Sequence, residues 1–183
     1  MPELRAGRLL VATPILDDPN FRRTVVLLCS HDEHGSFGLV LNRPLEATVA
    51  DLAPEWGRLA APPPLLFAGG PVDRVQAFAL ARRDQAAEES WWTAILEGIG
   101  LIGFDGDPSA LDGIEEARIF VGYAGWGAGQ LEAEVEEEAW FVVDAHPNDM
   151  FTAAPARLWH EVLGRQRGEL SLYRHFPPEP WLN

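Results

Sequence analysis

The order of strand-like and helix-like segments constrains this fold more than any other feature of the sequence. The apolar run TVVLLCSH, which starts at Thr24, predicts a strand that is buried on both faces. The segment FGLVLN, from Phe37, predicts the return strand of a hairpin with a loop of about five residues. Alternation and short apolar runs predict further strands at 7–14, 75–81, 117–126 and 139–145, and several short ones within 90–107.

Helical signals are sparse and come mostly late in the chain. Thr48 is placed to cap a short helix that runs to Leu52 and is stopped by Pro54. Amphipathic patterns predict one longer helix that begins at Gly129 and another over 155–166, in which Gly164 is a stop signal. Strands in a run, followed by alternation with helices only near the end, favour an α+β fold over a doubly wound parallel sheet. A length of 183 residues fits a single domain.

The charge balance restricts the partners that we expect. The chain has 28 carboxylates and 14 basic residues, all of them arginine, for a formal net charge of −14. Such a chain repels phosphate backbones and lacks the basic face of nucleic-acid-binding proteins, so we expect no direct binding to DNA. With Cys29 as its single cysteine it can form no intrachain disulfide, and it shows neither a signal peptide nor an apolar run that could span a membrane. We therefore expect a cytoplasmic protein without membrane contact.

The sequence leaves enzymatic activity open. No G-x-S-x-G, H-E-x-x-H or P-loop signature occurs, and the absence of lysine excludes P-loop and Schiff-base chemistry. In CSHDEH, Cys29 and His31 stand two apart and would share a strand face as a thiol and a base. The simpler interpretation makes Cys29 a buried hydrophobic residue, since no oxyanion hole or third group is apparent. His31 and His34 lack a third ligand, so no metal site and no cofactor are predicted.

The stretch GYAGWGAGQLEAEV, from Gly122, is the strongest local signal. A glycine-rich turn that leads into a helix can hold an anionic ligand, or it can simply let a strand and a helix pack closely. In the first case Trp126 would offer a stacking face and Gln130 an amide. The glycine spacing does not match the dinucleotide pattern G-x-G-x-x-G, so a Rossmann site is not favoured.

Two other strand ends carry residues suited to a ligand. In LLFAGGPV, Gly69 and Gly70 form a turn that would expose bare backbone. In LNRP, Asn42 and Arg43 follow a strand, and Arg43 is the best nearby cation for a carboxylate or a phosphate.

Four segments of the chain together resemble a known family. DPNFRRTVVLLCSH, GSFGLVLNRP, FAGGPV and GYAGWGAGQLEAEV occur in this order and are similar to the AlgH/YqgE family of small bacterial proteins. The resemblance runs from about Gly7 to about Gly164 and leaves 165–183 as a tail, within one domain spanning 1–183. It implies an α+β fold with an antiparallel-rich, barrel-like mixed sheet flanked by helices. The family has no agreed biochemical activity, and its name is linked to transcriptional regulation.

These observations lead to one functional hypothesis with two alternatives. We expect the four motifs to form one cleft that binds a small ligand or a protein partner, through Arg22, Asn42, Arg43, Gly69, Gly70, Trp126 and Gln130. The first alternative is a hydrolase or transferase that uses cleft carboxylates or Cys29. The second is a transcriptional regulator, for which the acidic charge favours indirect action through protein contacts. The oligomeric state is not predicted.

Overall fold

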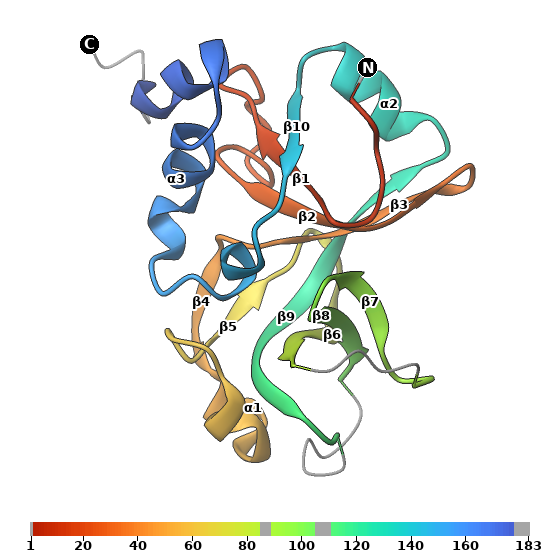
Figure 1. The fold of residues 1–183 in the computed structure, drawn as a ribbon, viewed down its shortest axis with the longest axis vertical. Helices are drawn as coiled ribbons and strands as arrows, with labels where there is room; N and C mark the ends of the chain where they lie inside the picture. The colour runs from red at the N-terminus through yellow and green to blue at the C-terminus, as the bar shows by residue number, and fades with distance from the viewer. Residues whose placement is uncertain (1, 85–88, 105–110, 178–183) are drawn as a thin grey trace.

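The computed structural model describes residues 2–84, 89–104 and 111–177, and within them ten strands form one hydrogen-bonded network (Figure 1). In chain order the strands are β1 (Arg8–Ala12), β2 (Val25–Asp32), β3 (Gly35–Val40), β4 (Pro44–Thr48), β5 (Leu65–Ala68), β6 (Val72–Arg83), β7 (Thr93–Leu96), β8 (Ile99–Gly103), β9 (Ile114–Gly127) and β10 (Trp140–Asp144).

The helices are short and surround this sheet. The α-helices are α1 (Val49–Leu52), α2 (Gln130–Glu136) and α3 (Leu158–Gly164), and the 3₁₀ segments are η1 (Pro54–Leu59), η3 (Pro147–Phe151), η4 (Pro155–Arg157) and η5 (Gly168–His175). Figure 1 shows α2 at one end of the molecule and α1 at the other, with α3 along one side. None of the helices in the described part of the chain is long and apolar enough to cross a membrane.

The sheet is mostly antiparallel and remains open. Its main path runs β10-β1-β2-β3-β9-β6-β8-β7, while β4 pairs with β5 and β5 pairs in parallel with β9. The α+β class and the antiparallel-rich sheet flanked by helices are thus confirmed. The barrel-like closure implied by the family resemblance is not formed, because the described strands leave β10 and β7 as two separate edges.

Both faces of the sheet are buried, as the continuous apolar run in β2 predicts. Leu27 belongs to a core cluster with Leu9 and the α3 residue Trp159, whereas Leu28 belongs to a second cluster with Leu10 and the α2 residue Leu131. Because successive side chains point to opposite faces of a strand, covering both faces requires apolar residues at odd and even positions alike.

Local signals fixed several element boundaries correctly. Thr48 caps α1 through a capping box with Asp51, and α3 ends at Gly164. The β2–β3 turn contains only Glu33 and His34, shorter than the predicted loop, since the Asp32 carboxylate accepts a hydrogen bond from the His34 backbone N–H at 2.8 Å. The predicted strand 117–126 is part of the longer β9, and η5 in the predicted tail was not anticipated. Residues 105–107 of the predicted short strands and 178–183 of the tail lie outside the described residues.

Candidate functional site

The site begins where β3 and β9 separate. These strands pair from Gly35↔Gly127 to Gly38↔Ala124, and beyond that point the chain at Gly69 lies between them. The Val40 backbone N–H donates to the Gly69 carbonyl at 2.8 Å, and the Gly69 N–H donates to the Val121 carbonyl at 2.9 Å. The FAGGPV segment thus fills the gap between two diverging strands.

Glycine is required at this insertion because backbone meets backbone. A Cβ on Gly69 would lie 2.3 Å from the Gly122 carbonyl oxygen, and a Cβ on Gly122 would lie 2.6 Å from the Gly70 carbonyl oxygen. Gly122 also has a φ of +72°, in the left-handed region. The glycines of two separate motifs are therefore in contact and permit a close backbone approach.

A groove of about 540 Å³ opens beside this insertion. We call it the arginine groove; it is lined by Pro19, Asn20, Val40, Arg43, Pro44, Leu45, Ala68, Gly70, Pro71, Arg74 and Val121. Three of the four sequence motifs contribute to this lining, and Val121 immediately precedes the fourth. Among the residues that the structure describes, two arginines and no carboxylate line the groove, in a chain whose formal net charge is −14.

Arg43 is half-buried in the connection between β3 and β4, directly before Pro44, and is held in place by a backbone carbonyl. Its Nη2 donates to the Arg22 carbonyl at 2.6 Å. Desolvation by burial lowers the pKa of Arg43, and the neighbouring positive charge of Arg22 lowers it further. A guanidinium stays protonated under such shifts near neutral pH, so the groove keeps a cation whose hydration is already reduced.

Asn42 supports the groove without lining it. Its Oδ1 accepts from the Val25 N–H at 3.0 Å, and its Nδ2 donates to the Arg23 carbonyl at 2.8 Å. The side chain therefore ties the start of β2 to the segment that follows β3. Arg22, in the turn before β2, is exposed and pairs with Asp17 at 3.7 Å rather than lining the groove.

Trp126 and Gln130 lie elsewhere, in a polar cluster at α2. The Trp126 indole is 5% exposed, and its Nε1 donates to the Glu134 carboxylate at 2.9 Å. The Gln130 amide donates to the same carboxylate at 3.0 Å and accepts from the Gly127 N–H at 3.1 Å. Phe21 stacks on the Trp126 ring at 6.0 Å between centroids. The structure thus brings Arg43, Gly69 and Gly70 together but keeps Trp126 and Gln130 apart from them.

The alternative nucleophile is in the core. The Cys29 side chain is 4% exposed, and burial raises the pKa of its thiol, so the reactive thiolate is disfavoured. His31 instead contacts the Ser36 hydroxyl at 2.8 Å and the Glu132 carboxylate at 3.5 Å. No group of three or more potential metal ligands occurs within residues 2–84, 89–104 and 111–177.

Sequence reasoning missed Arg74, the second cation of the groove. Arg74 lies in an exposed stretch of β6, where the register to β9 shifts between Val72 and Ala77. Asp73 has a φ of +42° at this irregularity. No sequence pattern marks such a bulge, because it depends on the partner strand. Asn20 was also missed, although it lies in DPNFRRTVVLLCSH, the first of the four motifs.

Comparisons with known proteins agree on a single family. A family model described as AlgH-like matches residues 9–171. A UPF0301 protein from Streptomyces coelicolor is 47% identical over 182 residues, covering 97% of this chain and 94% of the relative. A UPF0301 protein from Mycobacterium tuberculosis is 40% identical over 178 residues, covering 95% and 88% respectively.

Two solved structures share the fold. The crystal structure of a Corynebacterium diphtheriae protein matches with a TM-score of 0.89 at 29% identity, covering 96% of this chain and 94% of that one. The solution structure of the AlgH protein from Pseudomonas aeruginosa matches with a TM-score of 0.70 at 30% identity, covering 97% of each chain.

Proposed function

The chain belongs to the AlgH-like family, whose biochemical function is unassigned, and we propose that it binds a small anionic ligand in the arginine groove. The observation that carries this proposal is the charge of the groove lining. Its described lining residues include Arg43 and Arg74 and no carboxylate, although carboxylates outnumber arginines 28 to 14 in the whole chain. A local reversal of the overall charge attracts an anion and concentrates it at that place.

The size and composition of the groove favour a small molecule. Its volume of about 540 Å³ falls within the usual range of small-molecule sites, roughly 300–1,000 Å³. Val40, Leu45 and Val121 add apolar walls beside the two guanidinium groups. A ligand with a carboxylate or phosphate group and a small apolar body would satisfy both parts of the lining.

The lining supports binding rather than turnover. Within the described part of the chain, it holds no thiol, imidazole or carboxylate that could act as a nucleophile or a general base. The buried Cys29 cannot supply one, since it belongs to the core cluster. We therefore propose a ligand-binding protein that acts in the cytoplasm and, where it affects transcription, does so through other proteins rather than by direct contact with DNA.

A thermal-shift screen tests the groove. The probes are inorganic phosphate, small monophosphate esters and short-chain carboxylates, each compared across four proteins: the native chain, Arg43→Gln, Arg74→Gln and Arg58→Gln. Arg58 lies exposed on η1 and serves as a matched control. A probe that binds the groove should lose about 10- to 100-fold in affinity with either groove variant, since a charge-assisted hydrogen bond contributes about 1.5–3 kcal/mol.

Equal stabilisation of all four proteins, or no stabilisation at all, would contradict anion binding in the groove. If a probe stabilises all four proteins equally, it binds outside the groove. If no probe in the panel shifts the unfolding temperature of the native chain, small-anion binding in the groove is rejected. A gel shift at low salt tests the proposal that the protein does not contact DNA directly, and tight, salt-sensitive binding of DNA would contradict it.

A further inference from the structure

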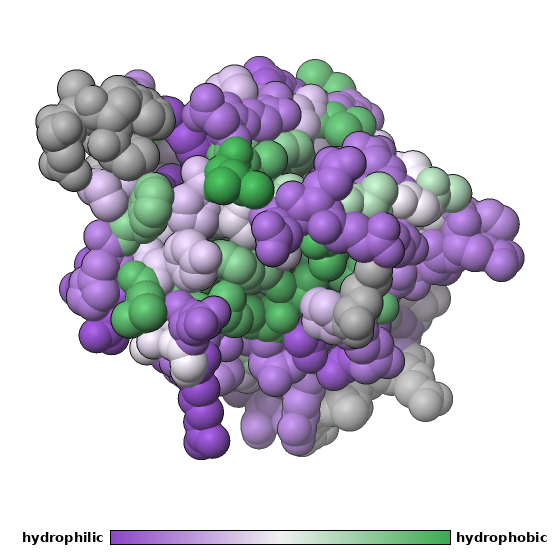
Figure 2. All heavy atoms as spheres, turned by 90° about the horizontal axis from the view of Figure 1, so that it is seen from above, coloured by the Kyte–Doolittle hydropathy of each residue, from purple (hydrophilic) through white to green (hydrophobic). Residues whose placement is uncertain are grey.

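A second cavity lies at the α2 end of the molecule, away from the arginine groove. We call it the apolar hollow; it has a volume of about 420 Å³ and is lined by Pro2, Thr13, Pro14, Ile15, Val135, Glu138, Trp140, Phe141, Val142, Leu170, Tyr173 and Phe176. Figure 2 views this end of the molecule and shows hydrophobic side chains gathered between hydrophilic ones. Elements distant in sequence, β10, α2 and η5, form its walls.

The hollow exposes apolar surface that the fold itself does not require there. Ile15 is 67% exposed on the turn after β1, and Tyr173 of η5 is 36% exposed. Thr13 and Glu138 are the most polar members of a lining otherwise made of aliphatic, aromatic and proline side chains. A concave apolar surface with a hydrophilic border is typical of a docking site for another protein.

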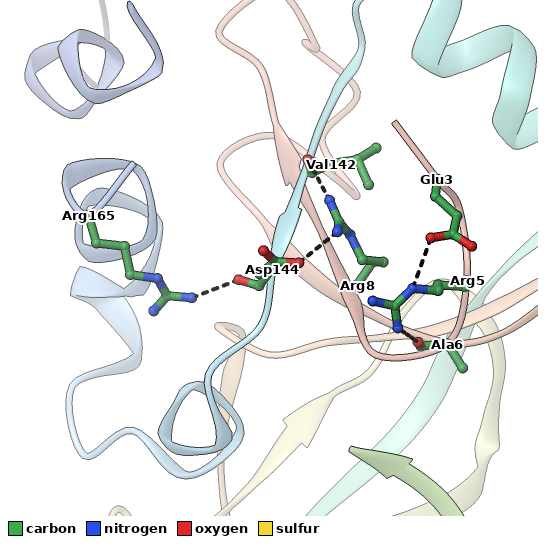
Figure 3. Close-up of polar contacts among 7 residues, drawn as sticks. All are labelled: Glu3, Arg5, Ala6, Arg8, Val142, Asp144 and Arg165. Atoms are coloured by element: carbon green, nitrogen blue, oxygen red, sulfur yellow. Dashed lines mark hydrogen bonds and ion pairs between the residues drawn. The ribbon is translucent and has the colours of Figure 1, made fainter. Parts of the chain in front are cut away.

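The adjacent edge strand is closed to strand addition. The Arg8 guanidinium donates to the Val142 carbonyl at 3.4 Å and to the Asp144 carboxylate at 2.6 Å, and Arg165 donates to the Asp144 carbonyl at 3.2 Å (Figure 3). An incoming strand would have to displace these side chains from the edge of β10. A partner would therefore dock through its side chains, as an amphipathic segment does in a groove.

Carboxylates occur at the α2 side of the hollow, where Glu138 is part of the lining and two further glutamates precede it in sequence. Glu136, Glu137 and Glu138 follow one another at the end of α2, and all three are exposed. Val135, directly before them, and Glu138 both line the hollow. Carboxylates placed beside an apolar cavity attract lysine or arginine side chains that flank apolar anchors.

From these observations we propose that the apolar hollow docks a basic amphipathic segment of a partner protein. Its apolar side chains would enter the hollow, and its lysine or arginine side chains would lie along Glu136–Glu138. A second copy of this chain fits less well, because each copy carries a formal charge of −14 and would repel the other. An anionic membrane surface is disfavoured for the same reason.

The experiment uses a fluorescein-labelled peptide of about 14 residues, long enough to form a helix, built from leucine and lysine at helical spacing. Its counterpart has glutamate in place of lysine. Fluorescence anisotropy with the full-length protein should show micromolar binding of the basic peptide and none of the acidic one. Because any basic peptide is attracted to an acidic protein, variants must locate the contact.

Ile15→Asp should weaken binding about tenfold, since it places a charge on the apolar wall. Leu52→Asp is the matched control: Leu52 is 53% exposed on α1, and the substitution adds the same charge at the other end of the molecule. It should leave the affinity unchanged. The double variant Glu136→Gln/Glu137→Gln should weaken binding about threefold and reduce its dependence on salt.

Three results would overturn this inference. One is equal binding of the acidic and basic peptides, which would leave the charge argument without support. The second is equal loss of affinity in Ile15→Asp and Leu52→Asp. The third is concentration-dependent self-association of the native chain, seen by sedimentation and abolished by Ile15→Asp, which would identify a second copy as the occupant. Circular dichroism of each variant confirms that the fold is retained.

Discussion

At the residue scale, Arg118 is the most unusual side chain in the core. It is 1% exposed on β9, and its guanidinium donates to the carbonyls of Met150, Thr152, Ala61 and Pro62 at 2.7–3.4 Å. It also lies over the Phe67 ring at 4.4 Å from the centroid. Desolvation by burial lowers the pKa of Arg118 to about 10, so the guanidinium is still charged at neutral pH. A single cation thus joins β9 to the C-terminal end of η3 and to the loop between η1 and β5.

Replacing Arg118 should cost much of the protein's stability. In Arg118→Met the carbonyls lose their shared donor, and we expect unfolding to require about 3–5 kcal/mol less free energy, as in other broken buried charge networks. Urea denaturation measures the loss. Arg58→Met, at an exposed position on η1, should change stability by no more than about 0.5 kcal/mol. A loss below about 1 kcal/mol in Arg118→Met would contradict the role assigned to these hydrogen bonds.

The buried thiol gives a second prediction at this scale. Because burial both shields Cys29 and raises the pKa of its thiol, the native protein should resist iodoacetamide near pH 8. The same reagent should label Cys29 fully in concentrated urea. Mass spectrometry distinguishes the two states. Rapid labelling of the folded protein would instead support the alternative hypothesis that Cys29 acts as a nucleophile.

At the scale of elements, two glycines, one in β9 and one at the start of α2, are required for different reasons of conformational freedom and space, which the sequence alone does not distinguish. Gly122 and Gly129 have nearly the same backbone conformation, with φ of +72° and +73°. A Cβ on Gly122 would meet the Gly70 carbonyl at 2.6 Å, whereas a Cβ on Gly129 would meet nothing within 4 Å. One position needs both conformational freedom and space, and the other needs conformational freedom alone.

Alanine substitutions should therefore differ. Gly129→Ala should cost about 1 kcal/mol, the usual cost of placing a side chain in the left-handed region. Gly122→Ala carries the same conformational cost and should lose about 2 kcal/mol more, because the backbone of the FAGGPV segment must shift. Thermal and urea unfolding of the two variants provide the comparison. Equal losses would show that the close approach of the two backbones contributes nothing.

The sequence predicted best those elements that are determined by residues close to one another in the chain. The β2 run and the Thr48 cap are set by neighbouring residues, and both are found as predicted. For the candidate site, the sequence picked out Arg43 and Gly70 because each follows a strand end. It could not place Trp126, since the burial of that indole depends on Phe21 and Glu134 across the fold. The sequence did not predict Arg74 as a groove residue, because its position depends on a shift in the register between β6 and β9.

At the scale of the whole molecule, the excess of negative charge should make stability depend on salt. A formal charge of −14 destabilises a compact state through self-repulsion. Several ion pairs, such as Arg157–Glu161, are exposed and contribute little. The partly buried pair of Arg165 with Asp149, at 2.6 Å, is screened much less.

We therefore expect the unfolding temperature to rise by a few degrees between low ionic strength and about 0.5 M sodium chloride, where the screening length falls well below 10 Å. Differential scanning fluorimetry at several salt concentrations measures the change, and repeating it with potassium chloride controls for ion identity. A fall in unfolding temperature over this range would mean that favourable ion pairs outweigh the self-repulsion.

The contact between Gly69, Gly70 and Gly122 also bears on how such a chain can vary over time. A side chain at Gly69 would collide with the backbone at Gly122, and one at Gly122 would collide with the backbone at Gly70. Neither Gly69 nor Gly122 can therefore be replaced unless the backbone opposite it shifts. Gly69 and Gly70 belong to FAGGPV and Gly122 to GYAGWG, the strings that make the chain recognisable, and steric exclusion alone is sufficient to require glycine at these three positions. The most recognisable strings of the sequence therefore mark positions that hold the backbone together. Arg74, which completes the arginine groove, lies in a segment that no sequence motif marks.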